Sequence, residues 1–310
     1  MADSSQLYQA VTAHLSAVQQ DPTTQLNERL LHEAEIFLPP HLHDDNKPQK
    51  RLQHLVAQLS ALLPTLQQEP SPAVRLLQKL VHPFSFTEIL RLPPTVDFSA
   101  ALDPAATPFH ALALSLLAKA ARSPQDAALL AGLPRQVHSL VRLWLTCADG
   151  GTAEAAQAVI LDLLAVDREP AAASGGGGGV VANGHSHPRG QGLFWRRFFG
   201  DRDIYGLLFS CCSLGPHGDA VLSKNARTLA QARLMAAVPR IGALDWACLA
   251  RKHHPDIESL YGGSATDDCG LLAYVSLRMV DYENDILIHM NLLQYYASLV
   301  ETVRETSVNR

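Results

Sequence analysis

Residues 192–214 have the sequence GLFWRRFFGDRDIYGLLFSCCSL and hold six of the nineteen aromatic residues of the chain. Aromatic side chains bury large areas, so this stretch is expected to anchor the helices that follow it. Asp201 is a favoured cap residue, which predicts that one helix ends near Gly200 and a second begins after Asp201. Arginines alternate with the aromatics, so the stretch is either a core-forming helix pair with one solvated side or a binding surface.

The composition is that of a folded protein. The chain has 310 residues, of which 47% are hydrophobic and 18% charged, and no apolar run approaches the roughly 18–20 residues of a membrane span. The formal net charge is −5. A duplex-binding surface normally needs a basic excess to displace counterions, so neither nucleic acid nor a membrane is expected as a partner.

Helical periodicity runs through the chain, and no convincing strand appears before residue 168. Leucines and valines over residues 52–63 recur at helical spacing and predict a strongly amphipathic helix. A Ser/Thr-Pro pair places a cap hydroxyl before a proline at the first helical position, and Ser-Phe-Thr-Glu resembles a capping box. We therefore expect caps at Ser71, Ser85, Thr107, Ser123 and Ser223, a helix end at Pro39–Pro40, and separate helices over 223–238, 240–252, 267–280 and 283–304.

The predicted fold class is all-α, as a curved α-solenoid of antiparallel helix pairs similar to HEAT or armadillo repeats. Helix pairs recurring about every 40–50 residues favour this architecture over a compact bundle. Residues 169–191 contain five consecutive glycines and predict a flexible linker or loop. It would separate N-terminal helical repeats (1–168) from a second set (192–310). The last helix is apolar over a wide arc, so we expect the array to continue beyond residue 310.

No motif of catalysis or cofactor binding is recognised. The five cysteines include no CxxC pair, which favours reduced thiols in a cytoplasmic or nuclear protein. The fourteen histidines form no zinc-ligand set with closed spacing, and no phosphate loop or nucleophile motif can be placed. The sequence therefore predicts a protein that is not an enzyme, with no cofactor and no metal.

What remains is a surface for a protein partner. Inner helices of a solenoid commonly form the wall on which partners dock. An acidic cluster near residue 283 could meet a basic partner, arginines near residue 230 an acidic one, and aromatic and arginine anchors the centre of the interface. Ordinary solvated faces and helix caps are the alternative. The candidate partner-binding residues are Trp195, Arg196, Arg227, Arg233, Asp281, Tyr282, Glu283 and Asp285.

Three blocks carry a family resemblance: residues 192–214, LSKNARTLAQARLMAAVP (222–239) and VDYENDILIHMNLLQYYASLV (280–300). The order of these blocks and their pattern of residue types resemble those of the fungal assembly chaperones of the 26S proteasome base, which are often labelled DNA mismatch repair proteins. The resemblance implies a HEAT-like solenoid without catalytic residues. It would bind the C-terminal domain of one proteasomal ATPase subunit and delay docking of the regulatory particle onto the core particle. The alternatives are a general scaffold or adaptor in transport, and a factor associated with DNA mismatch repair.

Overall fold

A computed structural model shows an all-helical protein. The described residues contain seventeen α-helices, two short 3-10 helices and no strand, which confirms the predicted all-α class. They divide into two compact units, Met1–Lys119 (unit 1) and Ala120–Arg310 (unit 2). The structure describes residues 4–41, 48–92, 98–168, 190–262, 270–281 and 285–308.

Unit 1 is built around its first four α-helices. Helix α1 packs on α2 and α3, and α4 packs on the same two helices. Leucine and valine side chains fill the space between them. This arrangement suits two stacked hairpins and a four-helix bundle equally well. The helices of unit 1 are α1 (Ser4–Gln20), α2 (Glu28–His41), α3 (Pro48–Leu62), η1 (Leu63–Thr65), α4 (Ser71–Val81), α5 (Phe86–Leu90), α6 (Phe98–Ala101), η2 (Thr107–Phe109) and α7 (His110–Ala120).

The predicted boundaries in unit 1 are right at Ser85 and wrong at Ser71, Thr107 and Pro39–Pro40. Thr107 is the first residue of η2 and does not cap it, because the cap position is Ala106. Ser85 and Glu88 form the expected capping box before α5. Ser71 is instead the first residue of α4, and its hydroxyl donates to the Glu69 carboxylate rather than capping the helix. Helix α2 runs through Pro39–Pro40 to His41. Buried residues such as Leu38 join α2 to the core, and this packing holds the helix beyond the point where local propensity ends it.

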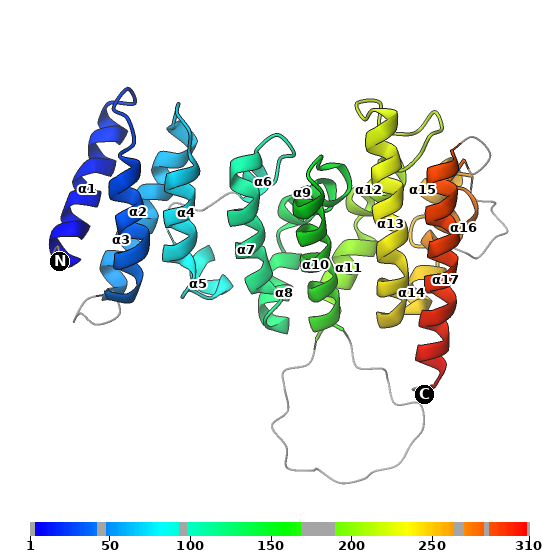
Figure 1. Ribbon diagram of the computed structural model, residues 1–310. Helices are drawn as coiled ribbons and strands as arrows, with labels where there is room; N and C mark the ends of the chain where they lie inside the picture. Colours follow the sequence, from blue (N-terminus) through cyan, green and yellow to red (C-terminus); the bar gives the residue numbers. More distant parts are fainter. Residues whose placement is uncertain are drawn as a thin grey trace, which may run out of the picture. The chain divides into compact units, whose positions relative to one another are not determined.

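Unit 2 is organised around α13, which packs on α9, α10, α14, α16 and α17. In Figure 1 this helix lies between α10 and α17. The N-terminal helices α8 and α11 pack on one another, and α12 packs on α9. The helices of unit 2 are α8 (Pro124–Ala131), α9 (Pro134–Thr146), α10 (Gly150–Val166), α11 (Leu193–Gly200), α12 (Arg202–Ser210), α13 (Lys224–Leu244), α14 (Trp246–Ala250), α15 (Pro255–Leu260), α16 (Leu271–Leu277) and α17 (Ile286–Val308).

Proline 239 lies inside α13 and does not end it. Ser223 caps α13 as expected, but the helix continues through Pro239 to Leu244, so separate helices over 223–238 and 240–252 are the wrong prediction. A proline in a helix interior loses one backbone hydrogen bond. Here Pro239 and its neighbour Val238 are buried against the surrounding helices, and this burial offsets the loss.

The aromatic stretch forms α11 and α12 with the boundaries that the sequence predicts. Helix α11 ends at Gly200, and the Asp201 carboxylate caps α12 by accepting from the backbone N–H of Asp203 and Ile204. Five of its six aromatics are buried, while Trp195 is half-buried. Phe209 also packs on Tyr274 of α16, with ring centroids 4.5 Å apart. Most of the aromatic surface of α11 and α12 is therefore buried in the core of unit 2.

The Asp167 carboxylate fastens the end of α10 to the start of α11. This residue is fully buried. Its side chain accepts from the backbone N–H of Gln191 at 3.0 Å and of Phe194 at 2.5 Å. Its carbonyl accepts from Gly192, whose φ of 67° is a conformation that favours glycine. These contacts keep residues 167 and 194 together inside one unit.

The boundary between the two compact units falls between Lys119 and Ala120 in the chain. This division differs from the one expected from the sequence, which places N-terminal repeats at 1–168 and a second set at 192–310. Helices α8 to α10 pack on α11 to α13. This packing joins helices on the two sides of the glycine-rich stretch, which the sequence interpretation takes as a boundary. The predicted linker covers residues 169–191, and residues 169–189 of it lie outside the described part of the chain.

Replacing Asp167 with alanine leaves the buried N–H of Phe194 and the part-buried N–H of Gln191 without an acceptor, and we expect unit 2 to lose about 3 kcal/mol of unfolding free energy. All three tryptophans lie in unit 2, so chemical denaturation followed by tryptophan fluorescence reports on this unit. Asp149→Ala is the matched control, because Asp149 caps α10 at an exposed site, and its loss is expected to cost about 1 kcal/mol. Equal losses in both variants would contradict a special role for Asp167.

Candidate functional site

A cavity of about 900 Å³ opens in unit 2 between α11, the end of α13, α14 and the C-terminal part of α17. We call it the Trp–Arg groove. Its walls combine aromatic rings with arginine side chains. The lining residues are Arg168, Gly192, Trp195, Arg196, Phe199, Gly200, Gly242, Ala243, Leu244, Asp245, Trp246, Ala247, Cys248, Arg251, His253 and Thr306.

Trp195 forms a fixed wall of the groove. Its indole Nε1–H donates to the Leu164 carbonyl at 2.8 Å. Its ring stacks on Phe199, with centroids 5.7 Å apart and planes 12° from parallel. One hydrogen bond and one stacked face hold the ring in place, so a partner meets a surface that is already ordered.

Charge at the groove is predominantly positive. Arg168, Arg196 and Arg251 line it, and Asp245 is its one acidic side chain among the described residues. The Asp245 carboxylate accepts from the Cys248 N–H at 3.0 Å and so caps α14. The Arg196 guanidinium donates to the Gln191 carbonyl at 2.8 Å, which positions it at the rim. The groove therefore offers cationic groups in a chain whose net charge is negative.

The second tryptophan of the groove depends on a glycine in α13. A Cβ placed on Gly242 would lie only 2.6–2.8 Å from three ring carbons of Trp246. Glycine at this position is what lets the ring approach the helix. The Trp246 Nε1–H is buried and has no hydrogen-bond partner among the described residues. An unpaired buried donor costs free energy, so the Trp246 ring is held here by its packing rather than by a hydrogen bond.

Beneath the rim, a buried polar network supports the aromatic wall. Glu258 is only 5% exposed, and its Oε1 accepts from the Tyr205 hydroxyl at 2.9 Å and from the His253 N–H at 3.0 Å. Burial and the neighbouring Glu258 raise the pKa of Tyr205, which keeps the hydroxyl protonated as a donor. The second oxygen of Glu258 has no hydrogen-bond partner among the described residues.

His253 joins this network to the groove. Its ring stacks on Phe199 with centroids 5.0 Å apart, and its Nε2 lies 2.9 Å from the Cys248 carbonyl. A carbonyl can only accept, so Nε2 carries the hydrogen in the neutral ring. Burial lowers the pKa of His253 below its ordinary value. The folded protein therefore favours an uncharged ring here.

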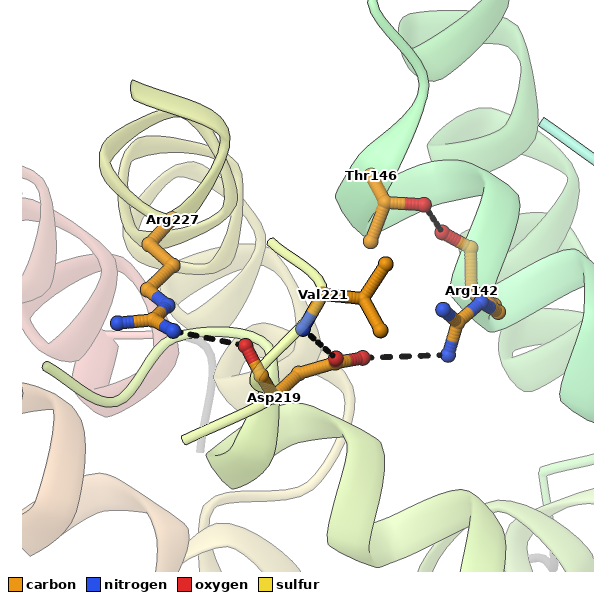
Figure 2. Close-up of polar contacts among 5 residues, drawn as sticks. All are labelled: Arg142, Thr146, Asp219, Val221 and Arg227. Carbon is orange, nitrogen blue, oxygen red and sulfur yellow. Dashed lines mark hydrogen bonds and ion pairs between the residues drawn. The ribbon is translucent and has the colours of Figure 1, made fainter. Parts of the chain in front are cut away.

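Two of the predicted arginines make structural contacts at another place in unit 2. Figure 2 shows Arg227 donating to the Asp219 carbonyl, at 2.7 Å, while the Asp219 carboxylate pairs with Arg142 of α9 at 3.3 Å. Arg233 donates to the Leu145 carbonyl at the end of α9, at 2.9 Å, and burial lowers the pKa of its guanidinium. Both side chains tie α13 to its surroundings, and their binding of a partner stays a prediction.

The acidic candidates that the structure describes, Asp281 and Asp285, do not line the Trp–Arg groove. Asp285 accepts from the N–H groups of Leu287 and Ile288 at 3.1 and 3.2 Å, and so caps α17. Asp281 is exposed and borders a separate cavity of about 270 Å³. Tyr282 and Glu283 lie outside the described residues. The groove thus unites only Trp195 and Arg196 of the predicted set.

Sequence reasoning missed Trp246 and Arg251 as members of the same site. No local pattern links Gly242 with Trp246, because the two residues belong to α13 and α14, which the extended Asp245 separates. Arg168 precedes the glycine-rich stretch and reaches the groove only because Asp167 fastens α10 to α11. The grouping depends on tertiary contacts between segments that are far apart in sequence.

Several kinds of site are not seen in the described part of the chain. It holds no group of three or more His, Cys, Asp or Glu side chains placed to bind a metal ion. No helix within the described ranges has both the length and the apolar content needed to cross a membrane. Cys147, Cys211, Cys212 and Cys248 are buried free thiols, and burial raises the pKa of Cys248 to about 12. That thiol stays protonated at neutral pH and is a poor nucleophile.

Gly242→Ala is expected to push the Trp246 ring toward water and to destabilise unit 2 by about 1–3 kcal/mol, because the added methyl overpacks the contact. The emission of Trp246, obtained as the difference from a Trp246→Phe variant, should move to longer wavelength. Gly206→Ala is the matched control in α12, because its Cβ would meet Ile257 at an ordinary 3.7 Å. A Gly242→Ala variant with unchanged emission and stability would contradict the close approach.

The lowered pKa of His253 predicts a pH dependence of stability. Below about pH 6.5 the unfolded chain binds a proton at this ring that the folded chain resists, so the unfolding free energy of unit 2 should fall as the pH drops from 7 toward 5. His253→Gln should flatten this slope in denaturation followed by tryptophan fluorescence. His138→Gln, on α9 of the same unit, is the control expected to keep it. If the unfolding free energy of wild type and His253→Gln changed with pH to the same extent, His253 would not be the source of the pH dependence.

In comparisons with models of protein families, with curated proteins and with solved structures, none matches this chain. The assignment of a function therefore depends on the resemblance of the three sequence blocks and on the groove in unit 2. Two of the eight predicted partner-binding residues, Trp195 and Arg196, lie in the first of these blocks and also line the groove.

Proposed function

We propose that this chain is a non-enzymatic assembly chaperone of the 26S proteasome regulatory-particle base. It binds the C-terminal domain of one ATPase subunit through the Trp–Arg groove. The observation that carries the proposal is the joining of Trp195, Trp246, Arg196 and Arg251 in one preformed cavity. Tryptophan and arginine in well-packed pockets are the residue types that dominate the energy of protein–protein interfaces.

Preorganisation of the groove supports a binding role. Hydrogen bonds to the Leu164 and Gln191 carbonyls hold Trp195 and Arg196 in place. The Trp246 ring is held by its close packing against Gly242. Ordering a long side chain at an interface costs about 0.5–1.5 kcal/mol, and this cost is smaller where the side chain is already held. The groove is therefore suited to recognise a partner without large rearrangement.

The family resemblance supports the identity of the partner. Its first block contributes α11 with Trp195 and Arg196, and its third block contributes most of α17, whose Thr306 end also reaches the groove. On this proposal the helix pairs of the two units belong to a curved α-solenoid. A partner in the proteasome base places the protein in the cytoplasm and the nucleus.

The proposed mechanism is steric and electrostatic. The groove and its surroundings capture the ATPase domain and occupy surface that it would otherwise use for other contacts. Stable interfaces of this kind bury about 1,200–2,000 Å², so the contact extends well beyond the groove itself. Release follows when later assembly steps compete for the same ATPase surface. No bond is made or broken, so no catalytic group is required.

The proposal is tested by affinity purification from a nuclease-treated fungal extract with this chain as bait. Mass spectrometry should recover one ATPase subunit of the proteasome base with its assembly neighbours. The purified C-terminal domain of that subunit should then bind the bait directly. Recovery of transport factors instead would favour a general adaptor. Repair proteins recovered only without nuclease would favour a DNA-associated role, and either result would contradict the chaperone function.

A further inference from the structure

We infer that the Trp–Arg groove is the centre of a longer docking track that takes an acidic, amphipathic segment of the partner. The inference rests on the proposed function, because it names the chemistry of the segment that the groove would hold. It comes from the way in which three cavities of unit 2 share lining residues, from the charge along them, and from the apolar surface at one end.

Two further cavities adjoin the groove. One of about 540 Å³ lies between α8, α11 and the start of α12, and it shares Arg196 and Gly200 with the groove. Another of about 330 Å³ lies between α14, α16 and α17, and it shares Trp246 with the groove. The shared residues show that the three cavities adjoin one another on unit 2. On this inference, a single segment of the partner crosses Arg196 and Trp246 and contacts all three cavities.

Positive charge follows this track. Among the described residues that line the three cavities, there are six arginines and two aspartates. Arg197 pairs with Asp201, and Arg202 pairs with Asp256, which lies outside the three cavities. Asp245 caps α14, so the six arginines still outnumber these three carboxylates. The chain as a whole has a net charge of −5, so this excess is local. Charge complementarity selects a partner segment that carries carboxylates.

The α17 end of the track is apolar. The cavity there is lined by Leu272, Leu299, Val300 and Val303 beside Trp246, with Arg304 as its one charged group. Val300 is 61% exposed and Val303 is 46% exposed, although valine gains free energy when it is removed from water. A segment with acidic residues at one end and apolar residues at the other fits both parts of the track.

These features favour a peptide over a single nucleic acid strand. A strand carries phosphates along its whole length and stacks its bases on exposed aromatic faces. Of the six arginines only Arg304 lines the cavity at α17, while one face of Trp195 is covered by Phe199. The cavity at α17 offers branched aliphatic side chains rather than aromatic faces for bases to stack on. Carboxylates and aliphatic side chains match this surface better.

The test uses fluorescence anisotropy with the full chain and short fluorescein-labelled peptides. The first peptide has glutamates in one half and leucines and valines in the other. In a second peptide, glutamines replace the glutamates, and in a third, alanines replace the leucines and valines. The first peptide should bind at least about tenfold more tightly than either analogue. A labelled oligothymidine of similar length should bind weakly or not at all.

Arg196→Ala combined with Arg251→Ala should weaken binding of the first peptide by about tenfold or more. Arg135→Ala is the matched control, since Arg135 is exposed on α9 and lines none of the three cavities. Unchanged tryptophan emission and circular dichroism show that the double variant is folded. Val300→Ser with Val303→Ser, on an exposed face, provides a second variant that tests the apolar end.

Equal binding of the glutamate and glutamine peptides, unchanged affinity of the folded double variant, or tighter binding of oligothymidine would each overturn the inference. These outcomes are separable from failure of the proposed function. If the double variant still recovers the ATPase subunit from extract, the track is wrong and the function stands. If wild type binds the acidic peptide but recovers no ATPase subunit, the chaperone function fails and the track stands.

Discussion

The buried carboxylate of Asp167 is the contact on which the candidate site depends. The first N–H groups of any helix lack intrahelical partners, and here Asp167 accepts from Gln191 and Phe194 at the start of α11. That bond fixes where α11 begins and how it is rotated. Phe194 then faces the core, while Trp195 and Arg196 reach the groove. A single acceptor at the end of α10 thus positions the candidate site on α11, through bonds to Gln191 and Phe194, which follow it by 24 and 27 residues in the chain.

The groove also depends on the aromatic core behind it. Phe199 stacks on both Trp195 and His253, all three of which line the groove, and Tyr205 links this layer to the buried Glu258. Aromatic pairs add about 0.5–1.5 kcal/mol beyond the area they bury. The stacked rings therefore form an ordered floor, and Arg196 is held at the rim by its bond to Gln191. On the proposed function, a partner would meet this arrangement without large changes in it.

Local rules predicted much of the fold and little of the site. Caps at Ser85, Ser123, Asp201 and Ser223 follow from side-chain chemistry within three residues, and the structure confirms them. The proline rule was wrong at Pro39–Pro40 and Pro239, where burial against other helices outweighs local preference. The cap rule was wrong at Ser71 and Thr107, which are first helical residues rather than caps. Trp195 and Arg196 could be chosen from the aromatic stretch alone. Trp246 and Arg251 could not, because their place in the groove is set by the packing of α13, α14 and α17, which no local pattern encodes.

The central claim is that the partner of this chain docks in the groove of unit 2. Hydrogen exchange measured by mass spectrometry, on the chain alone and on the chain with its purified partner, tests this claim most directly. Short helices and helix ends open readily, so α11, α14 and the end of α17 should exchange quickly in the free chain. The account predicts that the partner slows exchange in residues 193–200, 243–251 and 299–306. Protection confined to unit 1, with these three segments unchanged, would contradict it.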